Sequence, residues 1–363
     1  AAILFTEYKR SQVVGMTMAF ASVAAGANIN IFLTSIDYSL TELAKSSVNL
    51  VDSNYSYGYT GNLSFVVISS LLLALVISII TEIIARKKPV RIGTEELEIS
   101  EKLDKIGFKK SLFAFVIMCV LLAYAIIPGL PLSGFLLDSS QNMYINKLFG
   151  ANSPFVKGFL YIASLIFIIC AFIYGTATKQ IKNGKDMIKH IQSSLNGLGE
   201  MLLLIFVASQ FVALFKYTNI GNVVTVDLFN LVADIKPSFI ILLLLSFIVI
   251  AISNIFVPPL STKWTLFVPK MMPLFMKSNI TPEFTGAMFR LASSVTNIIS
   301  PIFSYFVVYL GFIGLYSKND FTIRKCYKML MPYFIAILIL WLFIVFGWYV
   351  LKAPIGPNVF PTI

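Results

Sequence analysis

Long apolar runs alternate with short polar segments along this chain. A run of about 20 residues is long enough for a helix to cross a bilayer core of about 30 Å. The clearest runs of this kind cover residues 62–85, 111–133, 154–175, 199–215, 237–257, 282–315 and 329–351. The pattern therefore predicts an all-α, polytopic membrane protein.

The opening run, 12–36, is interrupted by small and polar residues. Its middle places Gly26, Asn28 and Asn30 among apolar neighbours. Residues of this kind free backbone groups that lipid cannot satisfy. The run therefore predicts a helix with an unwound middle that faces protein or a watery cavity.

Composition agrees with a membrane location and disfavours an enzyme. The chain has 363 residues, of which 58% are hydrophobic and 12% charged, and its mean hydropathy is +0.85. Its three cysteines and its one histidine, His190, form neither a disulfide framework nor a metal-ligand spacing. A membrane-embedded transferase, the alternative from another class, would need a clustered acid, base or metal site. We expect no organic cofactor, and the absence of a Gly-rich phosphate loop disfavours an ATP-driven pump.

The net charge of +11 belongs to the loops and predicts the topology. Cytoplasmic loops collect Lys and Arg, so loops 86–110, 179–189 and 318–328 are expected inside. Segments 37–61 and 134–153 and the tail after residue 352 are then expected outside. Within loop 86–110, apolar residues recur at near-helical spacing between 97 and 106. They fit a short amphipathic helix on the membrane surface, and a solvated linker fits equally well.

Residues 254–301 are apolar overall, yet they contain Lys263, Trp264, Arg290 and Asn297. An arginine on a spanning helix costs about 2.5–3.5 kcal/mol by insertion scales, so it should face a protein cavity or an anionic ligand rather than lipid. The prolines and serines nearby also need a protein-lined or watery surrounding. We interpret this stretch as a substrate pathway.

Three stretches together resemble the AbgT family of membrane transporters, named for uptake of p-aminobenzoyl-glutamate. Residues 20–37 are similar to the family's glycine-rich broken helix, which ends in a Thr-x-x-Asp turn. Residues 185–221 are similar to its loop and helix with Ala-x-Gln-Phe and Tyr-Thr-Asn-x-Gly elements. Residues 254–301 are similar to its second re-entrant hairpin and the broken helix that follows. This last likeness rests on Ser261-x-Lys263-Trp264, Pro282, Arg290, Ser294-Val295-Thr296-Asn297 and Ser300-Pro301.

The resemblance implies an inverted-repeat secondary transporter with a re-entrant hairpin and broken helices, assembled as a homodimer in the plasma membrane. Residues 1–61 would then be the remainder of a first repeat that is apparently truncated. Residues 62–198 would form connecting helices and cytoplasmic loops, and residues 199–328 the second repeat. Residues 329–363 would be the last spanning helix and a tail.

Two departures from the family pattern bear on mechanism. The hairpin carries Pro258 and Pro259 where the family has small residues. The family also places an aspartate three residues after the arginine, and here that position is Ser293. An acid one turn after Arg290 could exchange partners with a substrate or a proton. Ser293 cannot, so Asp37 becomes the remaining acid candidate.

The resemblance implies a set of substrate-binding residues and a set of ion-binding residues. The first set is Arg290, Trp264, Asn254, Pro282, Asp37 and Ser293, and the second is Asn30, Asn297 and Thr296. Structural alternatives stay open for each. Arg290 could bind a carboxylate or tie helices together as an ion pair. The asparagines could bind sodium or hydrogen-bond across helices. Trp264 could stack on a benzoyl ring or simply pack, and Asp37 could be a helix cap.

We therefore expect a secondary active transporter of small carboxylate-bearing molecules. The resemblance implies p-aminobenzoyl-glutamate, related folate catabolites or antimetabolite drugs as cargo, with a sodium or proton gradient as the driving force. The sequence leaves two alternatives open. One is a dicarboxylate or short-chain fatty acid carrier of the same architecture, and the other is a non-transporting remnant.

Overall fold

The computed structural model describes residues 1–29, 31–87, 101–150, 152–195, 198–235, 239–317 and 322–363. Within these residues the chain is helical and forms no β-strand; two isolated bridges, Ile280 with Thr362 and Gly356 with Val359, are the sole β-type contacts there. The chain divides into two compact units. One comprises Ala1–Gly93 and Leu198–Ile363, and the other Thr94–Gly197.

The helices of the larger unit before the smaller one are α1 (Ala2–Glu7), α2 (Gln12–Gly26), α3 (Ser35–Asn49) and α4 (Leu63–Lys87). Those after it are α9 (Leu198–Tyr217), α10 (Ile220–Ile235), α11 (Phe239–Phe256), α12 (Leu260–Lys277), α13 (Pro282–Val295), the 3-10 turn η1 (Thr296–Ile298), α14 (Ser304–Ser317) and α15 (Ile323–Leu351).

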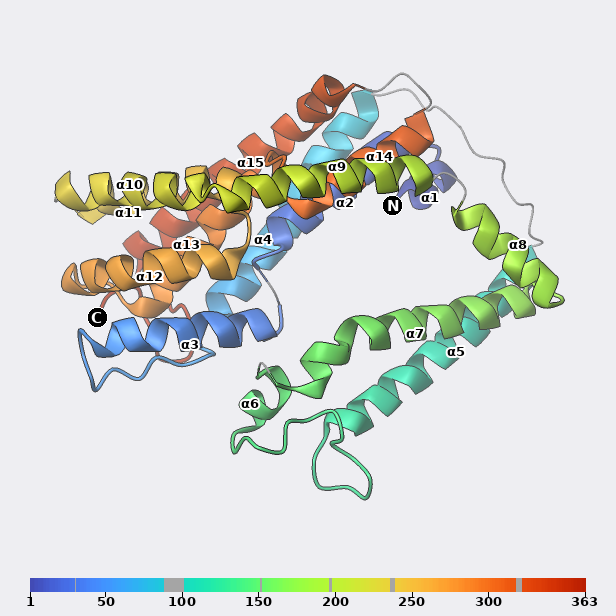
Figure 1. The fold of residues 1–363 in the computed structure, drawn as a ribbon, viewed down its shortest axis with the longest axis horizontal. Helices are drawn as coiled ribbons and strands as arrows, with labels where there is room; N and C mark the ends of the chain where they lie inside the picture. The colour runs from blue at the N-terminus through green and yellow to red at the C-terminus, as the bar shows by residue number, and fades with distance from the viewer. Residues whose placement is uncertain (30, 88–100, 151, 196–197, 236–238, 318–321) are drawn as a thin grey trace. The chain divides into compact units, whose positions relative to one another are not determined.

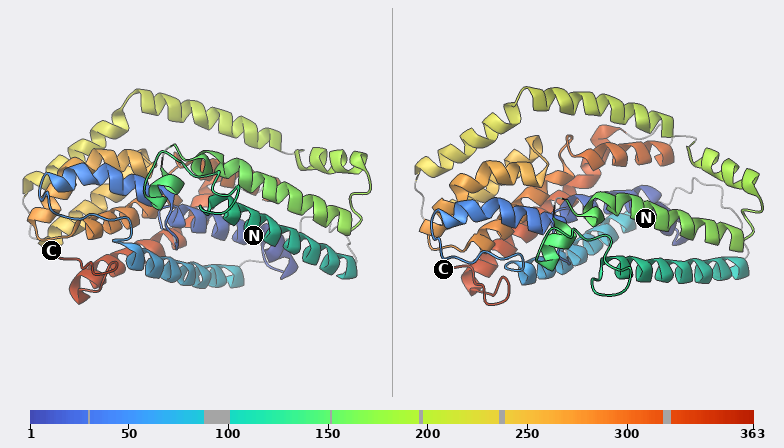
Figure 2. Two further views of the ribbon diagram at one scale, coloured as in Figure 1. Left: turned by 90° about the horizontal axis from the view of Figure 1, so that it is seen from below. Right: turned by 60° about the horizontal axis from the view of Figure 1, so that its bottom comes forward.

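The smaller unit contains α5 (Glu101–Ile126), α6 (Tyr144–Phe149), α7 (Pro154–Ala177) and α8 (Gly184–Leu195). Helices α5 and α7 run alongside each other (Figures 1 and 2). Their outward faces leave large apolar side chains such as Phe113, Leu160 and Phe167 mostly exposed. Apolar faces of this extent are typical of helices that contact lipid.

Four helices are long and apolar enough to cross a membrane: α4, residues 102–126 of α5, α7 and α15. The predicted runs correspond to these helices and to the shorter α9 and α11. The run 282–315 is a broken helix, because α13 ends at Val295 and α14 begins at Ser304. The opening run is broken as predicted, since α2 ends at Gly26 and α3 begins at Ser35.

Several helices were not predicted from the apolar runs, and α10 and α3 are the longest of them besides α12 of the hairpin. Only two residues separate the end of α9 from the start of α10. Helix α3 occupies about half of the segment 37–61, which we expected to be an external loop. Helix α3 is amphipathic, with Leu40, Ala44 and Val48 buried at a spacing of four. This face packs against α12 (Figures 1 and 2). Because its other face is polar, the sequence of α3 does not form an apolar run.

The expected surface helix near residues 97–106 is settled only in part. Residues 88–100 lie outside the described residues. From Glu101 onward the chain belongs to α5 and continues without a break to Ile126. The described half of the expected surface helix is therefore the start of a long apolar helix.

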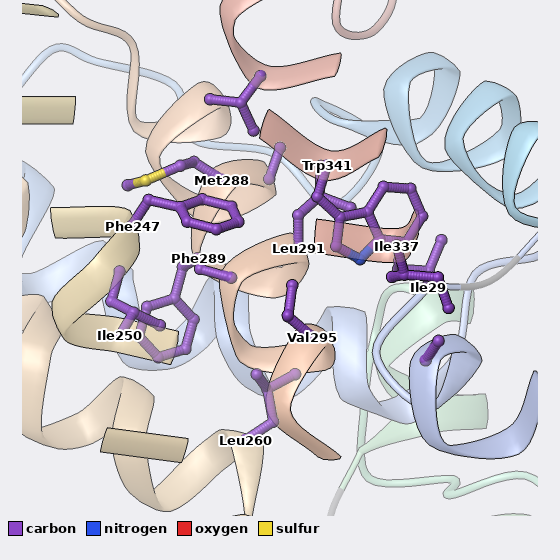
Figure 3. Packing of buried hydrophobic residues seen from close by; sticks show 14 of the residues in the cluster. Ile29, Phe247, Ile250, Leu260, Met288, Phe289, Leu291, Val295, Ile337 and Trp341 are labelled. Carbon is purple, nitrogen blue, oxygen red and sulfur yellow. The ribbon is translucent and has the colours of Figure 1, made fainter. Parts of the chain in front are cut away.

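Helix α13 lies at the centre of the larger unit. Every residue from Pro282 to Val295 is buried. Trp341 and Ile337 of α15 lie on one side of α13, and Phe247 and Ile250 of α11 lie on the other (Figure 3). The first half of the broken helix, α13, is thus enclosed by protein, as polar backbone at membrane depth requires.

Candidate functional site

The buried charges of this protein mark its candidate site. Among the described residues, the buried charged side chains are Asp37, Lys263, Glu283 and Arg290. They come from α3, α12 and α13, three helices of the larger unit. Charged side chains are almost never fully buried unless they are paired. Each of the four therefore needs a partner or a function.

Arg290 and Asp37 form a buried ion pair. The Arg290 Nη2 atom lies 2.6 Å from Asp37 Oδ1, and the two side chains are 3% and 7% exposed. The second guanidinium nitrogen, Nη1, is buried and has no hydrogen-bond partner among the described residues. The guanidinium is thus held by an acid on one side and keeps donor capacity on the other.

Local sequence places Asp37 for this contact. Thr34 caps α3, and its backbone N–H and hydroxyl donate to Asp37 Oδ2 at 2.6 and 2.8 Å. This reciprocal capping arrangement fixes the carboxylate in the first turn of the helix. One oxygen of Asp37 thus caps α3 while the other pairs with Arg290, and its role as a functional acid stays a prediction.

The start of α13 is equally well defined by its sequence. Thr281 caps the helix by accepting from the Phe284 N–H, and Pro282 occupies the first turn. Pro is favoured there because its missing N–H would lack a partner in any case. Glu283 follows, and Tyr55 donates to its Oε2 at 2.7 Å. The predicted residue Pro282 therefore orients the helix that carries Glu283 and Arg290.

Trp264 joins α12 to α3. Its indole Nε1 donates to the Leu40 carbonyl oxygen at 2.8 Å, and its ring lies 4.7 Å from the Phe289 ring, centre to centre. Trp264 is fully buried. A buried indole needs such a partner, so this bond fixes the ring beside α13.

These residues enclose a small chamber. It is lined by Arg290, Glu283 and Gly286 of α13, Trp264 of α12, Leu40 and Thr41 of α3, and residues of the segment 57–62. The space open to the centre of a water-sized sphere is about 10 Å³, which is room for about one water. The chamber is closed to any larger molecule in this conformation.

A second polar cluster lies where α13 ends. Lys263 Nζ donates to Asn254 Oδ1. Asn254 Nδ2 donates to Thr296 Oγ1 at 3.0 Å and to Asn297 Oδ1 at 2.8 Å. Asn297 in turn donates to the Ala24 carbonyl oxygen near the end of α2, at 3.0 Å. Lys263 has no ion-pair partner within the described part of the chain, and its ammonium group contacts the Asn254 amide oxygen and lies 6.0 Å from the centre of the Phe289 ring.

The hairpin formed by α11 and α12 has a cavity on the side away from the chamber. This cavity measures about 460 Å³ on the same scale and is lined by the tip residues 257–259, Lys216, Asn219 and Thr262. Thr262 and Trp264 are two residues apart on α12, which places them on opposite sides of the helix. Helix α12 therefore separates an open cavity from a closed chamber.

The structure brings the predicted residues into two groups. Arg290 and Trp264 line the chamber and Asp37 pairs with Arg290, whereas Asn254, Thr296 and Asn297 meet at the second cluster. Asn30 lies outside the described residues. Ser293 is buried one turn after Arg290, and its hydroxyl has no partner among the described residues. The functional roles of these residues stay predictions.

Sequence reasoning missed Glu283. An acid directly after a proline fits the ordinary start of a helix, so it attracted no attention. A signal was nevertheless present, because Glu283 lies seven residues before Arg290 and therefore on the same face of α13. Its near-complete burial could not be known without the contact to Tyr55.

Comparison with known proteins finds a family and individual relatives that are similar to this chain. The model of the AbgT putative transporter family matches residues 1–363. The p-aminobenzoyl-glutamate transport protein of Escherichia coli is 26% identical over 369 residues, covering all of this chain and 70% of that protein.

Two solved structures are similar in fold. The YdaH transporter of Alcanivorax borkumensis has a TM-score of 0.58 and 26% identity over 98% of this chain and 73% of that one. The antimetabolite efflux pump MtrF of Neisseria gonorrhoeae has a TM-score of 0.54 and 27% identity over 99% of this chain and 71% of that one.

Proposed function

We propose that this chain, which belongs to the AbgT family of transporters, is a secondary carrier of small aromatic carboxylates in the plasma membrane. Its cargo would be p-aminobenzoyl-glutamate or an antimetabolite of related structure. The similarity to a p-aminobenzoyl-glutamate transport protein and to an antimetabolite efflux pump supports this class of cargo. The observation that carries the proposal is the Arg290 guanidinium, which lines a closed chamber and has one donor nitrogen without a partner.

Arg290 is suited to exchange one carboxylate for another. Its planar donor fork matches a carboxylate in two-point geometry. In this conformation Asp37 takes one side of the fork. A substrate carboxylate that entered the chamber would bind the free side and compete with Asp37. The internal acid would thus neutralise the guanidinium whenever the site is empty, which avoids an unpaired buried charge.

The position of α12 supports alternating access. A helix with an open cavity on one side and a closed chamber on the other can expose the chamber by moving as a unit. The tip residues Pro258 and Pro259 border the open cavity. We infer that movement of the hairpin opens the chamber, with Trp264 packing on the aromatic part of the cargo.

The second cluster supports a role in ion coupling. Sodium prefers oxygen ligands, and unwound helix ends often supply them in transporters. Thr296, Asn297 and Asn254 provide hydroxyl and amide oxygens beside the break after α13. A sodium ion at this point would take over Asn254 Oδ1 from the Lys263 ammonium. We retain sodium and protons as candidate coupling ions, and uptake measured under imposed gradients of each would identify the ion.

Replacement of Arg290 by alanine tests the proposal. Arg290→Ala should abolish uptake of p-aminobenzoyl-glutamate into vesicles that contain the purified protein, because the carboxylate loses its partner. Arg86→Ala is the matched control, since that side chain is 78% exposed and pairs with Glu82 at the surface. Uptake by Arg290→Ala at the control rate would contradict the proposed anion site.

A further inference from the structure

Glu283, Gly286 and Arg290 form one wall of the chamber. All three belong to α13 and line the same cavity. Spacings of three and four residues place them one above another on a helix face. Seven residues separate Glu283 from Arg290, which corresponds to about 10 Å along the helix axis. The wall therefore has a carboxylate at one end and a guanidinium at the other, and the residue that lines the chamber between them, Gly286, has no side chain.

The gap at Gly286 faces an aromatic ring. A Cβ atom at this position would lie 3.7 Å from Trp264 Cη2 and 3.3 Å from the Tyr57 hydroxyl oxygen. The space beside Gly286 is therefore bordered by Trp264, which is suited to pack against a flat ring. A ligand that filled this wall would have an aromatic centre.

Tyr55 already shows what Glu283 can bind. Its phenol is an aromatic ring with a hydrogen-bond donor at the far end, and that donor contacts Glu283 Oε2 at 2.7 Å. Burial, together with the bond to Glu283, raises the pKa of the Tyr55 phenol, so the hydroxyl keeps its proton and donates. Tyr55 belongs to the segment 50–62 that covers the chamber, together with Tyr57.

A buried carboxyl cannot lose such a donor without cost. Glu283 is 2% exposed, and a buried polar group without a partner is strongly unfavourable. When segment 50–62 withdraws to admit a ligand, Tyr55 leaves Glu283. Another donor must then take its place.

We propose that Glu283 binds the hydrogen-bond donor on the aromatic end of the substrate while Arg290 binds its carboxylate. This inference rests on the proposed function and adds a residue that determines specificity. The two helical turns that separate Glu283 from Arg290 then match the distance between the amine and the carboxylate of the cargo. An arylamine such as that of p-aminobenzoyl-glutamate replaces the Tyr55 hydroxyl, and the ring lies beside Gly286 and Trp264. A ligand without the amine leaves Glu283 unsatisfied.

The test compares two ligands that differ only in the amine. Binding of p-aminobenzoyl-glutamate and of benzoyl-glutamate to the purified protein is measured by isothermal titration calorimetry. The unchanged protein should prefer the amine by roughly 10- to 100-fold, the range of one hydrogen bond to a charged group. Glu283→Gln keeps an acceptor oxygen but loses the charge, so it should reduce the ratio of the two dissociation constants several-fold. Glu42→Gln is the matched control and should keep the ratio, since Glu42 bonds Tyr59 of the same segment but does not line the chamber.

Each outcome discriminates. Equal binding of both ligands by the unchanged protein overturns the inference and leaves the proposed function standing. No binding of either ligand overturns both. Equal weakening of the binding of both ligands in Glu283→Gln shows that Glu283 only supports the start of α13, and the inference fails.

If Glu283→Gln does not fold, binding to the variant Tyr55→Phe tests the inference instead. Loss of the competing hydroxyl should tighten binding of the amine ligand several-fold, and unchanged binding of that ligand overturns the inference.

Discussion

At the scale of single residues, the Asp37–Arg290 pair ties stability to function. Removing one partner of a buried pair leaves an uncompensated charge, which costs about 3–5 kcal/mol. Asp37→Asn keeps the shape of the side chain and an oxygen that can still accept from Thr34, so it tests charge alone. We expect a clear drop in melting temperature of the purified protein. Glu82→Gln should have little effect, because that acid pairs with arginines at a half-exposed site. Equal melting temperatures would contradict a buried, mutually dependent pair.

Gly286 makes a second prediction at this scale. Gly286→Ala places a methyl group in tight contact with the Tyr57 hydroxyl and in ordinary contact with Trp264. Helix propensity favours alanine by about 1 kcal/mol, so the fold should tolerate the change. Ligand affinity should nevertheless fall roughly tenfold, since overpacking costs about 1–3 kcal/mol. Gly347→Ala is the control, because nothing lies within 4 Å of its added Cβ. Calorimetry that found full affinity in Gly286→Ala would show that the ligand does not use this wall.

The residues of the site could be predicted from the sequence only where their chemistry was unusual for its surroundings. Arg290 stood out because an arginine in an apolar run is costly, and Trp264 stood out through its motif. The partnership of Arg290 with Asp37 could not be derived, since 253 positions (290 − 37) separate the two residues. Glu283 looks like a common first-turn acid in the sequence, and only the folded structure shows that it is buried and bonded to Tyr55.

At the scale of elements, hydrophobic length predicted the spanning helices and local polarity predicted the break in the opening run. What remained hidden were elements whose partners lie far away in sequence. Helix α3 is polar on one face and buries the other against α12, so its average hydropathy resembles that of a loop. The family resemblance implied the break between α13 and α14, but the apolar run 282–315 by itself did not show it. Polar residues at 296, 297 and 300 bond to backbone and side chains of other helices, which no apolar count reveals.

These elements give the site its closed state. Helix α3 is held to α13 by the ion pair and to α12 by the Trp264 bond to Leu40. Segment 50–62 connects α3 to α4 and covers the chamber with Tyr57, Gly58 and Asn62. A shift of α12 would therefore strain α3 and, through it, the cover. The physical link between hairpin and cover is α3, which contacts α12 through the Leu40 carbonyl oxygen and α13 through Asp37, one turn apart on the same buried face.

At the scale of the whole molecule, a carrier must change the access of its cavities when cargo binds. Thr262 lines the open cavity beside the hairpin, whereas Thr265, one turn later on α12, is exposed but does not line it. With Cys119, Cys170 and Cys326 replaced, Thr262→Cys should react with a membrane-permeant maleimide at a rate that changes several-fold when p-aminobenzoyl-glutamate is added. The rate at Thr265→Cys should not change, because that position stays at the surface in both states. Equal rates with and without ligand at both positions would mean that α12 does not move between the two cavities. The chamber around Arg290 would then have no route to open, and a non-transporting role would fit the molecule better than a carrier.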